Sequence, residues 1–227
     1  MVLPSRHTRV RCSGPRLESS PLPEALPRIA PHRLNLPATL CLYCGSSTKA
    51  PPGHVALARS LGQLLARNGI ALVFGGGRIG LMGAAAEAAL AAGGKVIGII
   101  PDFLLRREVA HDHLSELVVT DSMHDRKRLM AERAEAFCIL PGGLGTLDET
   151  FEILTWAQLG LHAKPIVLLN HEGYWDPLLE LIDRLVANRY VRPEHRALLR
   201  VAPDLEALLP LLARLPPDTG IEDLDRV

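Results

Sequence analysis

Residues 136–149 read AFCILPGGLGTLDE, an apolar run that ends in a proline and a glycine-rich turn ahead of a helical pattern. A similar junction, ALVFGGGRIG, occurs at 71–80. Each junction predicts a buried strand followed directly by a helix. Backbone N–H groups in such turns, together with the positive end of the following helix, favour phosphate as a ligand. Glu149 adds a carboxylate to the same region, which indicates chemistry on a nucleotide.

The same alternation of short apolar runs and helical periodicity continues from residue 40 onward. The expected strands are Leu40–Cys44, Ala71–Phe74, Lys95–Ile100, Glu116–Thr120, Ala136–Leu140 and Pro165–Leu169. The expected helices are Val55–Arg67, Leu81–Ala92, Asp125–Arg133, Leu147–Leu159 and Trp175–Ala187. This rhythm is typical of an α/β domain with a doubly wound, Rossmann-like, mostly parallel sheet and helices on both faces. Ligands of such folds bind beyond the carboxyl ends of the strands, where both glycine-rich turns are expected.

The two ends of the chain differ from this pattern. Residues 1–36 are rich in Pro, Arg and Ser and show no apolar period, so we expect a disordered extension there. Residues 37–227 are expected to form a single domain. Within it, residues 188–227 hold several prolines and predict one or two terminal helices and an acidic tail.

Composition narrows the class of protein. The 25 Lys and Arg residues balance 25 Asp and Glu residues, so there is no overall basic field to hold a nucleic acid. No apolar run approaches the roughly 20 residues that cross a bilayer. We therefore expect a cytoplasmic protein that binds neither nucleic acid nor a membrane. Four cysteines, expected to be buried and structural rather than metal ligands or disulfides, stand at Cys12, Cys41, Cys44 and Cys138.

The first glycine-rich turn also satisfies the GxGxxG pattern of dinucleotide-binding folds. Such a fold needs an acid at the end of the next strand to bind the ribose. Asp102 stands near that place, but Pro101 intervenes and the spacing from the glycines is long. The pattern alone is weak, and we expect no bound cofactor.

Two segments carry charged residues that have both a structural and a functional interpretation. Three basic residues at 126–128 open a predicted helix, where they oppose the helix dipole. They form either a solvated face behind a Ser122 cap with Asp125, or a site in which Arg126 donates to a phosphate or a leaving group. Similarly, Thr146 and Glu149 match a capping box, although the preceding glycines favour close approach of a ligand.

Five motifs in one order make the chain recognisable. They are CGSS at 44–47, GGG at 75–77 with GLMG at 80–83, MHDRK at 123–127, PGGLGTLDE at 141–149 and TWAQLG at 155–160. Together they resemble the Lonely Guy (LOG) family, from about Leu40 to about Tyr190. The resemblance implies hydrolysis of the N-glycosidic bond of cytokinin riboside 5′-monophosphates, and of AMP in several bacterial relatives. It also implies a homodimer or a higher homo-oligomer.

By the same resemblance, Arg126 and Glu149 form the catalytic pair. The residues implied to contact the nucleotide or its phosphate are Ser46, Gly76, Gly77, Met82, Glu108, Lys127, Gly142, Gly143, Gly145, Thr146, Asp148 and Thr155. A carboxylate such as Glu149 would stabilise the positive charge that develops on the ribose when the base leaves. Arg126 would either quench charge on the departing base or fix the ribose. A non-catalytic carrier of a nucleotide or of molybdenum cofactor, built on the same fold, is the rival hypothesis.

Overall fold

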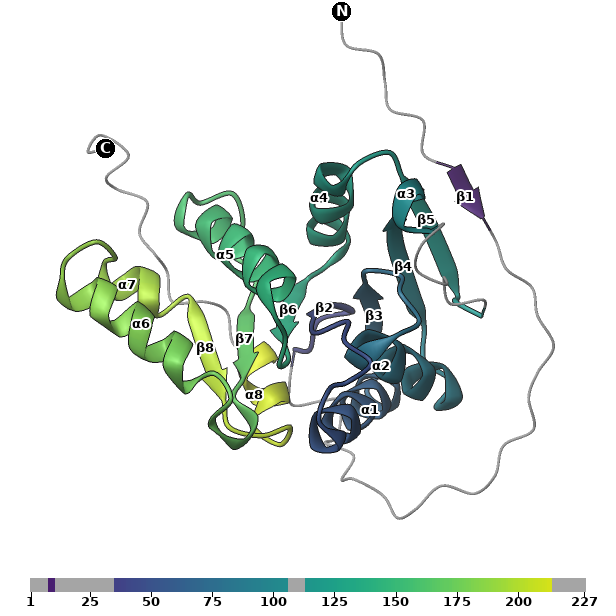
Figure 1. Ribbon diagram of the computed structural model, residues 1–227, viewed down its shortest axis with the longest axis horizontal. Coiled ribbons are helices and arrows are strands. Elements are labelled where there is room, and N and C mark those ends of the chain that lie inside the picture. Colours follow the sequence, from purple (N-terminus) through teal and green to yellow (C-terminus); the bar gives the residue numbers. More distant parts are fainter. Residues whose placement is uncertain (1–7, 11–34, 106–112, 214–227) are drawn as a thin grey trace, which may run out of the picture.

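The computed structural model describes residues 8–10, 35–105 and 113–213. The strands in these residues are β1 (Thr8–Val10), β2 (Thr39–Tyr43), β3 (Ala71–Phe74), β4 (Val96–Pro101), β5 (Glu116–Thr120), β6 (Ala136–Ile139), β7 (Ile166–Leu169) and β8 (Leu199–Ala202). The helices are α1 (Pro52–Arg67), α2 (Gly80–Ala91), α3 (Asp102–Leu105), α4 (Met123–Arg133), α5 (Leu144–Gln158), α6 (Asp176–Ala187), α7 (Pro193–Arg196) and α8 (Leu208–Ala213). Figure 1 shows how they alternate along the chain.

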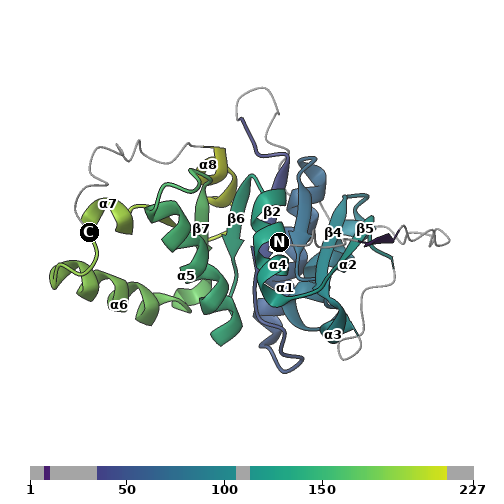
Figure 2. The ribbon, with the colours of Figure 1, turned by 90° about the horizontal axis from the view of Figure 1, so that it is seen from above.

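The described strands form one sheet in the order β1-β5-β4-β3-β2-β6-β7-β8. All neighbours from β5 to β8 are parallel, and β1 alone pairs in antiparallel fashion, on the outer edge of β5. Figure 2 shows β1 at one end of the row. The predicted doubly wound, mostly parallel sheet is therefore confirmed.

Two apolar clusters lie on opposite faces of this sheet. One packs the sheet against α1, α2 and α8, and the other packs it against α4, α5 and α6. Every residue of β3, β4, β6 and β7 is buried, as expected for parallel strands covered on both faces. The interior strands read as unbroken apolar runs for this reason.

The order of the strands places the ligand-binding edge. β2 lies in the middle of the sheet, the chain adds β3, β4 and β5 on one side of it, and then returns to add β6, β7 and β8 on the other. The order reverses between β2 and β6, and ligands of doubly wound sheets bind in the crevice at such a reversal. There the Gly45 N–H donates to the Pro141 carbonyl at 3.0 Å, so the loops that follow the two strands are in contact.

The carboxyl-terminal part of the domain differs from the prediction. Residues 188–227 do contain the short helices α7 and α8, but between them the chain forms β8 on the outer edge of the sheet. The sequence does not reveal this strand because Arg200 interrupts a run of only four residues, of which the middle two are partly exposed. Of the predicted disordered extension, the structure describes strand β1 and residues 35–36, and the rest lies outside the described residues.

The cysteines of the described region are buried and free, as predicted, and Cys12 lies outside it. Cys41 belongs to one apolar cluster and Cys44 to the other, so this CxxC pair points to opposite faces of the sheet. Burial raises the pKa of all three thiols, that of Cys138 to about 12. They remain protonated, which suits a structural role. None of the helices in the described ranges is long and apolar enough to cross a membrane.

Candidate active site

Arg126 lies inside the protein although it stands in the first turn of a helix. The predicted cap of α4 is confirmed, since the Ser122 hydroxyl accepts from the Asp125 N–H at 3.0 Å. The next residue turns inward, and Arg126 is only 7% exposed. A Cβ on Gly75 would fall on the Nη2 atom of Arg126, so the missing side chain of this glycine makes room for the guanidinium. The interpretation of Arg126 as part of a solvated basic face is therefore wrong.

The buried guanidinium is only loosely held by the protein. Its Nη2 atom lies 3.4 Å from the Gly75 carbonyl oxygen, and its Nη1 atom lies 3.7 Å from the Met123 sulfur. The Nε atom has no hydrogen-bond partner among the described residues. An unmade hydrogen bond of a buried donor costs about 1–3 kcal/mol, and native proteins contain few such groups. Arg126 therefore keeps donors that a ligand can satisfy.

Glu149 faces this guanidinium from helix α5. Its Oε1 atom lies 3.9 Å from the Arg126 Nη2 atom, and its side chain is 13% exposed. Burial raises the pKa of the Glu149 carboxyl to about 7, against the opposing effect of Arg126. An acid with a pKa near neutrality, beside a buried cation at the ligand-binding edge, is the arrangement expected of an acid–base or electrostatic catalyst.

A second set of charges lies beside this pair. The Lys127 ammonium contacts the Asp148 carboxylate at 3.1 Å and the Glu152 carboxylate at 3.0 Å. Asp148 is 62% exposed, because a helix turns about 100° per residue and Glu149 takes the buried side. Sequence reasoning missed Glu152. It stands three residues after Glu149 on α5, and side chains three residues apart are neighbours on a helix surface.

Helix α5 begins three residues earlier than predicted. Its N-cap is Gly143, and the Leu147 N–H donates to the Gly143 carbonyl at 3.0 Å in the first turn of the helix. Thr146 therefore lies within the first turn, and the capping-box interpretation of Thr146 with Glu149 is wrong. The difference arises because glycine is tolerated at an N-cap without a side-chain hydrogen bond. The N–H groups of residues 144–146 belong to the set that an α-helix leaves without intrahelical partners.

Residues 141–146, the second glycine turn, leave open space beside two of their glycines. A Cβ on Gly143 or on Gly145 would meet no atom within 4 Å. Neither residue has a positive φ angle. The fold therefore requires glycine at neither position, whereas the close approach of a ligand to the backbone would favour it.

The remaining predicted residues lie around this edge at different depths. Gly76 and Gly77 are buried in the first glycine turn (residues 75–77), and Gly76 has a φ of +78°. Met82 is buried in the first turn of α2, while Ser46 is exposed in the loop after β2. Glu108 lies outside the described residues.

Thr155 lies farther along α5, on the side of Asp148, about 10 Å from it by the rise of the helix. Its hydroxyl donates to the Phe151 carbonyl at 2.7 Å.

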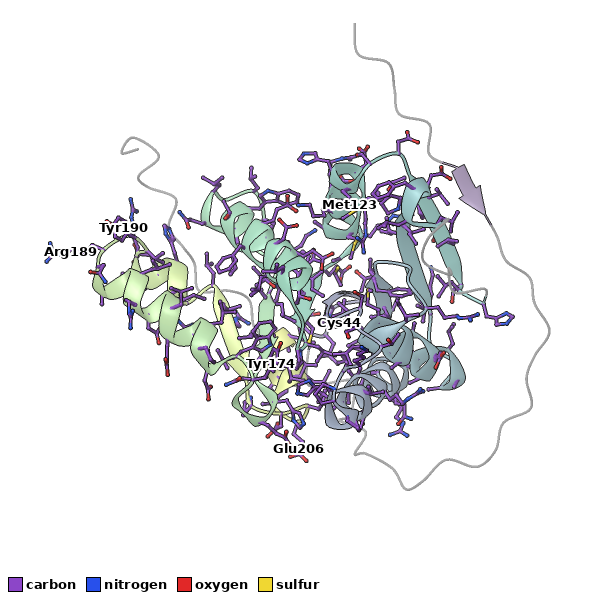
Figure 3. The ribbon with its side chains drawn as sticks, viewed as in Figure 1. Cys44, Met123, Tyr174, Arg189, Tyr190 and Glu206 are labelled. Atoms are coloured by element: carbon purple, nitrogen blue, oxygen red, sulfur yellow. The ribbon has the colours of Figure 1, made fainter. Side chains whose placement is uncertain are left out.

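Tyr174 also reaches the second glycine turn, and sequence reasoning missed it. Its hydroxyl donates to the Gly142 carbonyl at 2.7 Å. Figure 3 shows Tyr174 in the same central part of the molecule as Cys44, the residue that follows β2. The available signal was its position after the predicted strand at 165–169, because neighbouring parallel strands end at the same edge of the sheet.

Comparison with known proteins supplies the family. A family model described as "Possible lysine decarboxylase" matches residues 82–212. A cytokinin riboside 5′-monophosphate phosphoribohydrolase from Rhodococcoides fascians is 44% identical over 174 residues, which cover 76% of this chain and 88% of that protein. The chain belongs to the LOG family. A second LOG relative, a cytokinin riboside 5′-monophosphate phosphoribohydrolase from Arabidopsis thaliana, is 41% identical over 179 residues, 79% of this chain and 82% of that protein.

A solved structure shares the LOG fold at lower similarity. The molybdenum cofactor carrier protein of Chlamydomonas reinhardtii superposes with a TM-score of 0.59 at 25% identity, and the match covers 78% of this chain and 98% of that chain. The sequence identity to the LOG phosphoribohydrolases is thus higher than the identity to this carrier.

Proposed function

We propose that the protein hydrolyses the N-glycosidic bond of nucleoside 5′-monophosphates with an adenine-type base, namely cytokinin riboside 5′-monophosphates and AMP. The products are the free base and ribose 5-phosphate. The observation that carries the proposal is the buried Arg126–Glu149 pair beside the open helix start of the second glycine turn. The names of the LOG relatives with 41% and 44% identity support the same reaction.

In this reaction the phosphate binds to the N–H groups at the start of α5, where the helix dipole adds to the attraction. Cleavage of the bond between the ribose C1′ and the base nitrogen develops positive charge on the sugar. The Glu149 carboxylate stabilises that charge and activates the attacking water. Arg126, with its unsatisfied donors, neutralises the charge on the departing base or holds a ribose hydroxyl.

The description of the family model raises lysine decarboxylation as another activity, and Lys127 is the lysine beside the site. Burial alone would lower the pKa of Lys127, but hydrogen bonds and charges from Glu152 and Asp148 raise it above its usual value. A lysine that forms a Schiff base needs a neutral amine, which a lowered pKa supplies. The paired ammonium of Lys127 therefore favours hydrolysis over decarboxylation.

A non-catalytic carrier is the second candidate, and the fold similarity to the molybdenum cofactor carrier favours it. A carrier needs a phosphate-binding edge, but it has no use for an acid whose pKa lies near 7 beside a buried cation. The buried pair therefore supports the enzyme over the carrier.

The direct test is incubation of the purified protein with AMP and with isopentenyladenosine 5′-monophosphate, with chromatography of the free base. Glu149→Gln keeps the shape of the side chain and should lower base release at least about 10²-fold. The matched control is Glu87→Gln, an exposed carboxylate on α2 that pairs with Arg59 at 3.4 Å, and it should release base at the wild-type rate.

Base release that Glu149→Gln leaves unchanged would remove this residue from the mechanism. Measurable binding of both nucleotides without release of base from either would favour the non-catalytic carrier.

We also propose that the protein forms a homo-oligomer through α5 and the loop behind it. Phe151 on α5 and Leu159 and Leu161 just after its end are 39%, 55% and 69% exposed, and exposed apolar side chains that lie close along the chain favour an interface. Light scattering after size exclusion should give a mass of at least twice the 24.7 kDa chain, and a monomer at micromolar concentration would contradict the proposal.

A further inference from the structure

Tyr174 connects the loop after β7 to the second glycine turn. Its hydroxyl donates to the Gly142 carbonyl at 2.7 Å, a short hydrogen bond between residues that are 32 positions apart. The side chain is not part of the apolar core, since Tyr174 is 42% exposed. Its position is therefore not explained by burial of the ring.

The ring of Tyr174 is nevertheless held on two sides. The His54 ring on α1 lies edge-on to it at 5.2 Å, and the Trp175 ring lies edge-on at 4.8 Å. Trp175 is buried, and its backbone N–H donates to the Asn170 side-chain oxygen at 2.8 Å, while the Asn170 side-chain NH₂ donates to Asp176 at 2.7 Å. Edge-to-face contacts of this kind stabilise one orientation of an aromatic side chain. The hydroxyl is thus presented to Gly142 from a fixed direction.

The peptide groups of the second glycine turn need such support. Two consecutive glycines, Gly142 and Gly143, leave the backbone free to adopt many conformations. Each peptide is planar and trans, so a held carbonyl fixes the direction of the N–H on the opposite side. The Gly45 N–H holds the Pro141 carbonyl at 3.0 Å, and the Tyr174 hydroxyl holds the next one. Together they orient two successive N–H groups, those of Gly142 and Gly143.

We propose that Tyr174 is a positioning residue that fixes the Gly142–Gly143 peptide so that the second glycine turn is preorganised for the 5′-phosphate. This inference rests on the proposed function, because it assigns the phosphate to that turn. Preorganised donors bind a charged group without the cost of ordering them at the moment of binding.

The test is Tyr174→Phe, which keeps the ring and its edge-to-face contacts and removes only the hydroxyl. A hydrogen bond contributes about 1 kcal/mol, so kcat/KM for AMP should fall about fivefold. The value for adenosine, which lacks the phosphate, should stay at the wild-type level. Tyr190→Phe is the matched control, because Tyr190 is 83% exposed at the far side of the molecule and should change neither value (Figure 3).

An equal fall of kcat/KM for AMP and adenosine would show a merely structural role, and wild-type kcat/KM values for both substrates would show no role in phosphate positioning. Either result overturns the inference. Calorimetric affinities for AMP and adenosine separate it from the proposed function. If the wild type binds AMP but releases no base, the proposed hydrolysis fails, while a fivefold loss of AMP affinity in Tyr174→Phe alone still supports the positioning role.

Discussion

The first glycine turn is enclosed by side chains, whereas the second is open to solvent at two of its glycines. In the first, a Cβ on Gly75 would displace Arg126, and Gly76 combines a positive φ with close contact to Ile100. In the second, Gly142 packs against the backbone of Gly45, but the next two glycines meet nothing. The two turns follow strands on either side of β2, at the same edge of the sheet.

Glycine can occur in such a turn for two reasons, and the two cannot be told apart in the sequence. In the first turn the protein itself requires Gly75, whose missing side chain makes room for Arg126 from α4, and Gly76, which has a positive φ and lies against Ile100. The open glycines of the second turn are required by nothing inside the protein, and a ligand is the remaining reason for them. The first turn therefore makes room for the buried cation Arg126, and this comparison supports the proposal that the second turn binds the substrate.

Gly75→Ala should break the first turn with the largest effect. The added Cβ must push the Arg126 guanidinium aside, and a misplacement of about 1 Å at a catalytic group can cost 10²-fold in rate. We expect kcat/KM for AMP to fall about 10²-fold, with a small change in the melting temperature because only the flexible end of Arg126 has to move. Steady-state kinetics and thermal melting check this. Wild-type kinetics in the folded variant would show that the position of Arg126 is not critical.

The pH dependence of stability should report the burial of Glu149 behind the second turn. With its pKa raised to about 7, the folded protein keeps this proton at a pH where the unfolded chain has lost it. Stability therefore falls between about pH 4.5 and pH 7, by up to about 3 kcal/mol in total. Glu149→Gln should be more stable than the wild type at pH 8 and similar to it below pH 4.5, as measured by urea denaturation.

Catalysis should depend on the same proton with the opposite trend. Because the ionised carboxylate is the active form, kcat/KM should rise with pH through about 7. Identical stability profiles for the wild type and Glu149→Gln would contradict the burial argument, and activity that falls with pH in this window would make Glu149 a general acid instead.

Gly145→Ala should test the role of the second turn in ligand binding with the smallest change to the fold. Alanine in place of glycine stabilises a helix by roughly 0.5–1 kcal/mol, so the melting temperature should not fall. AMP affinity should fall about tenfold, as expected when one hydrogen bond to a charged phosphate is disturbed. Calorimetry checks the affinity.

Gly53→Ala is the matched control for this variant. Gly53 is also the second residue of a helix, α1, and a Cβ there would likewise meet no atom within 4 Å. The same gain in stability without a loss of AMP affinity is expected. If the Gly145→Ala and Gly53→Ala proteins bind AMP with equal affinity, ligand binding does not explain the glycine at position 145.

Much of this arrangement could be predicted from the sequence, because buried parallel strands leave unbroken apolar runs and the turns between strand and helix leave glycines. Helices α4 and α5, which carry Arg126 and Glu149 within their first two turns, both follow parallel strands and therefore begin at one edge of the sheet. Strand β8 could not be predicted, because an edge strand is only partly buried and contains Arg200. The start of α5 was misplaced because a glycine N-cap leaves no side-chain signal.

Contacts across the sheet edge were also beyond the sequence. The bond from Tyr174 to Gly142 depends on the pairing of β6 with β7, and Glu152 becomes part of the site only because Lys127 on another helix faces it. A sequence motif identifies residues within one segment, whereas each of these contacts connects two segments that are distant in the sequence.

The proposed function requires that the second glycine turn bind the phosphate of a nucleotide whose base is then released. The most direct test is the ratio of kcat/KM for AMP to that for adenosine in the wild-type protein, measured as released adenine. Because binding energy at the phosphate is used at the reacting carbon, adenosine should react at least about 10²-fold more slowly, with a lower kcat as well as a higher KM. Equal rates for the two substrates would contradict the account.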